Sequence, residues 1–162
     1  MAVARNEHGV EGNTVSYSYT KDGKLTGMAD AIGEYQKVTY DTKGNVASTT
    51  NGAGETTTYT YDEKGQCTGI TVSREENGET VTITSHYVYN TAGDIIQSID
   101  NMGNVTSYEY DSNGNQTAAV DAKGRRFTYE YDSLGNMVKT TYPDGTFETF
   151  ACHPEWILVY RR

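Results

Sequence analysis

Tyrosine and glycine recur along the chain with a period of 21 residues, and this spacing limits the possible folds more than any other feature. The second tyrosine of each Tyr-x-Tyr-like pair, called the key tyrosine below, recurs at intervals of 21, 21, 28, 21 and 21 residues, at Tyr19, Tyr40, Tyr61, Tyr89, Tyr110 and Tyr131. One glycine series lies four residues after these tyrosines and a second lies halfway between them, and together they hold 13 of the 17 glycines. Glycine adopts positive φ in tight turns without steric cost. Two glycines per repeat therefore predict two chain reversals, and hence two strands.

The residues beside the glycines carry turn chemistry. Asp or Asn follows the key tyrosine in five of the six repeats, as in Tyr40-Asp41-Thr42-Lys43-Gly44, and the second turn reads Asp-x-x-Gly, as in Asp121-Ala122-Lys123-Gly124. A short Asx side chain accepts a hydrogen bond from the backbone two residues further on. The segments between turns alternate with period 2, as Thr56–Tyr61 does, which is typical of strands. We predict an all-β meander of about thirteen antiparallel strands in one open, curved sheet, a partial β-shell.

The one long repeat tests this interpretation. Its seven extra residues flank Gly78, three before it and four after it. An insertion split across a turn lengthens both strands of one hairpin and keeps the register outside it. Residues 73–79 are therefore predicted to form a protruding polar hairpin tip.

The tyrosine rows predict one packed face of the sheet. Each Tyr-x-Tyr pair places both rings on the same face. We expect the gap between rows to be filled from a position six residues after the key tyrosine, which holds Leu25, Val46, Cys67, Ile95 and Met137, with Gln116 breaking the series. The opposite face, rich in Thr, Glu and Lys, is expected to be solvated.

Composition supports a folded, acidic β protein. Leu, Ile, Val and Phe make up only 25 residues, which together with a net charge of −9 would suggest disorder, but 14 Tyr, 24 Thr and only 2 Pro favour strands. The acidic charge disfavours nucleic acid or an anionic membrane as the main partner. No apolar run approaches the roughly 20 residues that span a bilayer, and residues 1–7 lack a signal-peptide core. We expect no membrane insertion.

Three segments are expected. Residues 1–11 form a partial N-terminal strand, residues 12–149 form the repeat array, and residues 150–162 depart from the repeat. Within the last segment, Trp156-Ile157-Leu158-Val159-Tyr160 is either a strand that caps the final hairpin or the start of a further segment.

The pattern Tyr-x-Tyr-Asp-x-x-Gly-Asn resembles the Rhs/YD repeat. Residues 108–115 and 129–136 match it closely, and the resemblance extends over roughly residues 12–148. Rhs proteins, toxin-complex C subunits and teneurins use such repeats as a β-sheet spiral, which in bacteria forms a hollow shell around a C-terminal toxin. The resemblance implies a spiral of this kind here. It also implies a secreted or cell-surface location. The chain lacks the Asp-Pro-rich segment that closes bacterial shells and shows no separate toxin domain, so we carry over no self-cleaving or toxic residue.

Few residues suggest chemistry, and we predict no catalytic, cofactor-binding or metal-binding residue. Cys67 occupies a position that is apolar in most other repeats, so we predict a buried structural thiol. A disulfide with Cys152 is possible in principle. Cys152 and His153 are adjacent, and neighbours on an extended segment point to opposite faces, which disfavours a catalytic dyad. His8 and His86 are scattered, without metal-ligand spacing. Asp111-Ser112-Asn113-Gly114-Asn115 faintly resembles a calcium loop, but turn chemistry explains it.

A structural scaffold is the leading functional hypothesis, with no enzymatic activity and no cofactor. Its expected partners are the rest of a larger Rhs-type polypeptide or its toxin cargo, and the open sheet edges also predict edge-to-edge self-association. The alternative is a cell-surface module that binds glycans or a protein through the tyrosine face. A third hypothesis, a Cys/His enzyme, rests on Cys152 and His153 alone.

Overall fold

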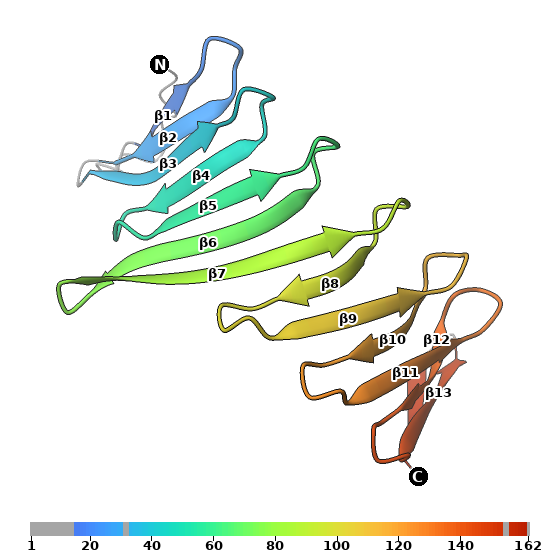
Figure 1. Ribbon diagram of the computed structural model, residues 1–162. Coiled ribbons are helices and arrows are strands. Elements are labelled where there is room, and N and C mark those ends of the chain that lie inside the picture. The colour runs from blue at the N-terminus through green and yellow to red at the C-terminus, as the bar shows by residue number, and fades with distance from the viewer. Residues whose placement is uncertain (1–14, 31–32, 154–155, 162) are drawn as a thin grey trace. The chain divides into compact units, whose positions relative to one another are not determined.

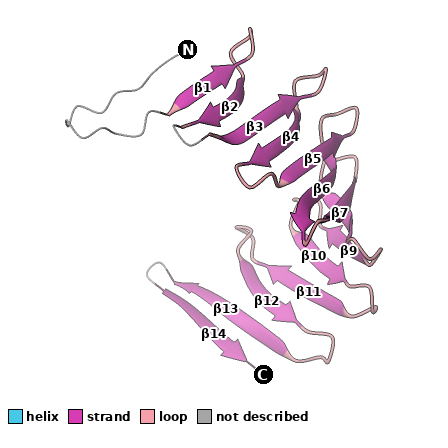
Figure 2. Ribbon diagram, turned by 90° about the vertical axis from the view of Figure 1, so that its left-hand side faces the viewer, coloured by secondary structure: helices cyan, strands magenta, loops and turns pink. Residues whose placement is uncertain are grey.

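The computed structural model describes residues 15–30, 33–153 and 156–161, with the backbone alone for residues 34, 151–153 and 156–161. These residues form fourteen strands that follow one another in sequence order within the sheet, each hydrogen-bonded to the next (Figure 1). Short turns join the strands, and Figure 2 shows no helix among the residues it describes. The described part of the chain thus has no helix long and apolar enough to cross a membrane. The predicted all-β antiparallel meander is confirmed, with fourteen strands instead of about thirteen.

The chain divides into two units, residues 1–85 and residues 86–162, and the division falls within β7. The strands of the first unit are β1 (Ser16–Tyr19), β2 (Leu25–Ala29), β3 (Glu34–Tyr40), β4 (Val46–Asn51), β5 (Thr56–Tyr61), β6 (Cys67–Glu76) and the larger part of β7 (Glu79–Tyr89). Those of the second unit are the end of β7, β8 (Ile95–Ile99), β9 (Val105–Tyr110), β10 (Gln116–Val120), β11 (Arg126–Tyr131), β12 (Met137–Thr141), β13 (Phe147–His153) and β14 (Trp156–Arg161).

The two predicted terminal segments differ in how far the structure describes them. The expected strand in residues 1–11 lies outside the described residues, and the first described strand is β1. At the other end, β13 runs through His153, and β14 pairs with it in antiparallel register from His153↔Trp156 to Glu148↔Arg161. The non-repeat segment after residue 149 therefore continues the sheet.

Among the described residues, ten turns share one backbone pattern. In the turn after Tyr40, Asp41 N donates to Asn45 O at 2.9 Å and Gly44 N donates to Asp41 O at 3.1 Å. The glycine of each such turn has a φ between 75° and 102°, the left-handed region that favours glycine. This is a three-residue hairpin loop closed by a left-handed residue. The prediction that the two glycine series supply the chain reversals is confirmed.

A β-bulge accompanies each key tyrosine, which the sequence analysis did not anticipate. Tyr61 pairs with Cys67 whereas its neighbour Thr60 pairs with Gly69, so Thr68 is the extra residue. The same one-residue slip occurs at the other five key tyrosines. Because of the slip, Cys67 and Ile70 both lie opposite tyrosines although they are three residues apart. Bulges also increase the local twist of the strands.

The long repeat forms an extended hairpin, as predicted. β6 has ten residues and β7 eleven, and only Asn77 and Gly78 lie between them. Their φ values of 54° and 82° are those of a type I′ turn, for which Asn-Gly is the preferred pair. The insertion thus changes the turn type as well as the strand length.

The sheet is one layer thick in the described residues, so its tyrosine face is only half-buried. Val38 and Ala118 are the buried hydrophobic residues of this part, and no large side chain is fully buried. Of the described key tyrosines, Tyr19 is exposed and the others are half-buried. On the opposite face, Thr60 and Glu109 are exposed. Stability must therefore come mainly from contacts within the sheet.

Candidate functional site: the tyrosine ladder

A tyrosine hydrogen bond links successive hairpins. These bonds lie beside the turns that follow the key tyrosines, called the key turns below. Four key tyrosines donate their hydroxyl to a backbone carbonyl fifteen residues earlier, at the first residue of the preceding strand. The bonds of this tyrosine ladder are Tyr40 to Leu25 (2.7 Å), Tyr61 to Val46 (2.9 Å), Tyr110 to Ile95 (2.8 Å) and Tyr131 to Gln116 (2.8 Å). Each bond connects the second strand of one hairpin to the first strand of the next hairpin, so it joins two successive repeats.

The ladder explains why Gln116 is tolerated among apolar residues. We expected the side chains at this position to fill the space between the tyrosine rows, with Gln116 as the exception. In the structure its backbone carbonyl is the acceptor, and every residue type provides one. Only the recurrence of tyrosine itself could have signalled this bond, because the acceptor leaves no trace in the sequence.

Three of the four ladder hydroxyls are held in their neutral form. Desolvation raises the pKa of Tyr61, Tyr110 and Tyr131 above the ordinary value, and negative charge nearby adds to this effect. For Tyr131 one such charge is Asp111, in the key turn of the preceding repeat. A neutral phenol keeps its proton and remains a hydrogen-bond donor to the carbonyl.

Where an Asp opens a turn, its side chain organises that turn. Asp111 Oδ1 accepts hydrogen bonds from the backbone N–H of Asn113 and of Asn115, both at 2.9 Å, and Oδ2 accepts from Asn115 Nδ2 at 2.9 Å. These bonds, with the Asn115 side chain foremost, hold the pKa of Asp111 below its usual range. Four other turn aspartates have lowered pKa values through similar bonds: Asp41, Asp100, Asp121 and Asp132.

One repeat uses the same network with its polarity exchanged. Asn90 stands at the turn position of Asp111, and its Nδ2 donates to Asp94 Oδ2 at 2.9 Å, whereas in the other repeat Asn115 donates to Asp111. Asn90 Oδ1 still accepts the backbone N–H of Ala92 and Asp94. These two turns thus combine an acceptor oxygen at the first position with a complementary side chain at the fifth.

This network accounts for the sequence that resembled a calcium loop. Both carboxylate oxygens of Asp111 already accept hydrogen bonds within the turn. Among the described residues, no group of three or more His, Cys, Asp or Glu side chains is placed to hold a metal ion. The geometry is that of an Asx turn.

Cys67 and His86, two of the residues singled out from the sequence, lie on different strands. Cys67 is half-buried at the start of β6, where its Sγ lies 3.5 Å from Gly69 O. His86 is exposed on β7. Cys152 and His153 are consecutive backbone positions of β13, paired with Ile157 and Trp156. The side chains of these two residues, and all of His8, lie outside the described part of the chain, so the possible Cys67–Cys152 pair stays a prediction.

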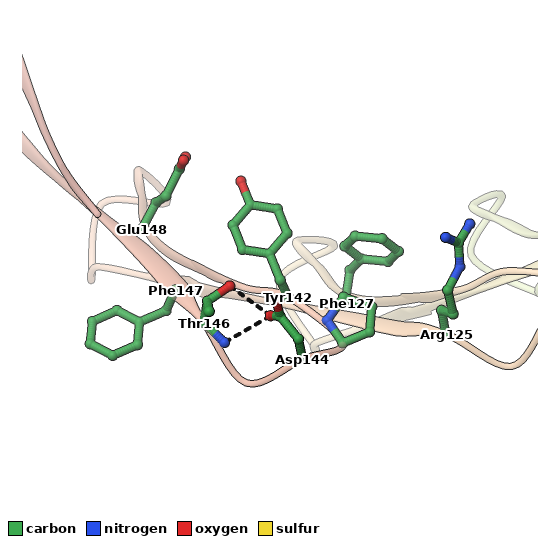
Figure 3. Close-up of a pocket in the computed structure, with 8 residues that line it drawn as sticks. Arg125, Phe127, Tyr142, Asp144, Thr146, Phe147 and Glu148 are labelled. Atoms are coloured by element: carbon green, nitrogen blue, oxygen red, sulfur yellow. Dashed lines mark hydrogen bonds between the residues drawn. The ribbon is translucent and has the colours of Figure 1, made fainter. Parts of the chain in front are cut away.

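An aromatic hollow lies in the second unit, at the turns that join β10 to β11 and β12 to β13. Phe127 and Tyr142 meet edge to face, with ring centroids 6.2 Å apart and planes at 80°. Figure 3 shows these rings, with Phe147 pointing away from them. The open hollow measures about 690 Å³ and is lined by Arg125, Phe127, Tyr142, Pro143, Asp144, Thr146, Phe147 and Glu148. A sequence signal that could have revealed it is the Tyr142-Pro143-Asp144-Gly145 turn, with tyrosine where eight of the nine other turns of this pattern carry Asp or Asn.

The RHS repeat family profile matches residues 40–80, 89–126 and 110–146, together more than half of the chain. The chain belongs to the RHS repeat family. This confirms the resemblance drawn from the Tyr-x-Tyr-Asp-x-x-Gly-Asn pattern. No curated protein sequence matches the chain.

Solved structures share the fold of this RHS repeat chain. The crystal structure of TcdB2-TccC3-Cdc42 superposes with a TM-score of 0.77 at 11% identity, and that of TcdB2-TccC3 with a TM-score of 0.77 at 12% identity. The Tc holotoxin pore of Photorhabdus luminescens, carrying a TccC3-D651A mutation, gives 0.69 at 18% identity. Each alignment covers 93% of this chain but only 9% of the other. At these identities the likeness concerns the fold, which is a repetitive β-sheet.

Proposed function

We propose that this chain is a non-catalytic wall segment of a larger, secreted or cell-surface RHS protein, and that the wall encloses a C-terminal toxin. The observation that carries the proposal is the repetition of one structural unit: an Asx turn, a bulge and a tyrosine hydrogen bond to the preceding hairpin. Such a unit can be added many times without a change in geometry. The fold shared with the TcdB2-TccC3 structures supports the same role.

A wall of this kind requires more repeats than the chain contains. Neighbouring strands lie about 4.8 Å apart, so each two-strand repeat adds roughly 10 Å of wall. The half-buried tyrosine face is suited to contact with another protein segment, because no second layer of this sheet covers its aromatic rings. Partners of the wall are then the remaining repeats of the same polypeptide and the cargo within.

Protection of the cargo tests this role. The parent protein, expressed from its complete reading frame, is treated with protease, and digestion of the region after the repeats is followed by mass spectrometry. We expect that region to survive in the intact protein and to be digested when expressed alone. Equal digestion in the two cases would refute enclosure.

A separate assay tests the absence of catalysis. The purified protein is screened for self-cleavage and hydrolysis of common substrate classes, with Cys152→Ser as the variant. A robust activity that this substitution abolishes would replace the scaffold proposal by the Cys/His enzyme.

The aromatic hollow favours a second candidate, a glycan-binding surface. Phe127 and Tyr142 offer ring faces and edges, while Arg125, Asp144 and Glu148 offer hydrogen-bonding groups beside them. Sugar rings are recognised by this combination of apolar stacking and polar contacts. A glycan array with hits that disappear in Tyr142→Ala would support this function, and an array without hits would dispose of it.

A further inference from the structure

The β6–β7 hairpin reaches beyond its neighbour in the first unit. The last residue of β6 that pairs with β5 is Ser73, opposite Thr56, so Arg74–Glu76 extend past the end of β5. Figure 1 shows the hairpin end projecting beyond the turn between β4 and β5. On the other side, β7 pairs with β8 only from His86 onward. Within the described residues of the first unit, the outer edge of residues 79–83 has no strand partner.

The register of the hairpin shows which backbone groups point outward. Side-chain hydrogen bonds join Glu75 to Thr80 at 2.5 Å and Ser73 to Thr82 at 3.4 Å, so these residues lie opposite each other. In a two-residue type I′ hairpin the closing pair exchanges backbone hydrogen bonds, and bonded and non-bonded pairs then alternate. Thr80 and Thr82 fall in non-bonded pairs. Their N–H and C=O groups therefore point away from β6.

This edge has the composition of a strand that accepts another. Residues 79–83 read Glu-Thr-Val-Thr-Ile, with β-branched residues at four of five positions, which favours a regular extended backbone. Thr80 and Thr82 are exposed, and Ile83 is 42% exposed. A regular exposed edge without proline, bulge or lysine is open to strand addition.

The charges at the hairpin end select the partner. Arg74 is engaged by Glu76 at 2.7 Å, which leaves Glu75 and Glu79 as the uncompensated charges near the tip. A second copy would add its own uncompensated carboxylates to this edge, and like charges disfavour association. The net charge of −9 adds to this repulsion. An extended segment that carries lysine or arginine is favoured instead.

We propose that the outer edge of β7 at residues 79–83 binds an extended, basic segment of a separate protein as an added β-strand. The backbone of Thr80 and Thr82 supplies the hydrogen bonds, Ile83 supplies apolar contact and Glu79 supplies charge recognition. This docking edge distinguishes the seven-residue insertion from the ordinary repeats, whose described strands are only four to seven residues long. Strand addition of this kind obtains its affinity from main-chain hydrogen bonds and its specificity from side chains.

The probe is a capped octapeptide of alternating lysine and valine, titrated into the isotopically labelled chain and followed by NMR and amide hydrogen exchange. We expect the amides of Thr80 and Thr82 to become protected on binding. An octapeptide of alternating glutamate and valine should bind at least tenfold more weakly, and raised salt should weaken the binding of the lysine peptide.

Three variants separate strand addition from simple charge attraction. Thr82→Pro removes an outward N–H and the side-chain hydroxyl without breaking a backbone hydrogen bond of the hairpin, and it should weaken lysine-peptide binding at least tenfold. Thr82→Val loses the same hydroxyl but keeps the N–H and should bind as the parent does. Glu79→Lys leaves the backbone unchanged and should reverse the preference between the two peptides, so the test does not depend on the folding of the proline variant.

Equal binding by Thr82→Pro and Thr82→Val would refute strand addition. So would the absence of binding, or peptide-induced shifts confined to other parts of the sheet. Self-association of the parent chain in sedimentation, lost in Thr82→Pro, would show that a second copy occupies the edge and would overturn the proposed basic partner.

Discussion

Removing one hydroxyl of the tyrosine ladder should destabilise the sheet by a measurable and local amount. Tyr131→Phe keeps the ring and deletes the hydrogen bond of 2.8 Å to Gln116 O. A typical intramolecular hydrogen bond contributes about 1 kcal/mol net, because the unfolded chain bonds to water instead. The carbonyl of a half-buried residue can regain water in part, so a loss of about 1 kcal/mol is expected. For a chain of this size that corresponds to a fall in Tm of about 2–4 °C.

The same strand provides the matched control. Tyr129 lies two residues earlier on the same face of β11, and its hydroxyl makes no hydrogen bond with the described residues. Tyr129→Phe should therefore change stability by less than about 0.5 kcal/mol, the range of substitutions away from specific interactions. The assay is urea unfolding followed by circular dichroism, with both variants and the parent at the same protein concentration.

The four bonds of the ladder should add. Equivalent tyrosines of adjacent repeats lie two strands apart, about 10 Å, a distance at which effects are usually independent. Replacing Tyr40, Tyr61, Tyr110 and Tyr131 together by Phe should cost about 4 kcal/mol, a large fraction of the 5–15 kcal/mol typical of a domain. Equal effects of Tyr129→Phe and Tyr131→Phe, or no effect of either, would refute the structural role given to the ladder.

Three further predictions concern the turns. Gly114→Ala should destabilise the chain by about 1–2 kcal/mol in urea unfolding, because φ is +84° although no atom blocks the added methyl group, and Gly114→Asn should cost less; equal costs would contradict a backbone origin. Asp111→Asn alone should lower Tm, whereas the double change with Asn115→Asp should restore most of it, since it reproduces the Asn90–Asp94 pair; a double variant no more stable than the single one would contradict the network. The turn aspartates have folded pKa values below their unfolded values, so they contribute stability above the unfolded pKa of about 3.9, which is lost as pH falls through the folded values; unfolding free energies at pH 6 and pH 3 measure this, and no decrease at pH 3 would contradict it.

The turns were predictable because their chemistry is local. Glycine supplies a positive φ, and the Asx side chain bonds the backbone two and four residues further along. Both effects act within five residues, so the repeated sequence displays them directly. The long hairpin was predictable for a related reason, since an insertion divided across Gly78 can preserve register only by lengthening both strands. Its two-residue turn type was not predicted, although Asn77-Gly78 is the pair that such a turn prefers.

The bulges and the aromatic hollow were not predictable from alternation. A residue such as Thr68 looks like any other strand position, and only the pairing of Thr60 with Gly69 reveals that it is extra. The aromatic contact joins residues fifteen positions apart, Phe127 on β11 and Tyr142 just after the end of β12, and it depends on the register that brings these two strands together. The assumption of one packed tyrosine face also needed correction, because a single layer leaves those rings half-buried.

By itself, the sequence determined where the chain turns, which residues form strands and that the strands follow one another in a meander, since each of these depends on neighbouring residues. Only the tertiary structure decided what connects one hairpin to the next. The tyrosine hydroxyls bind backbone carbonyls, which every residue possesses, and no pattern of side chains can mark an acceptor that all residues share.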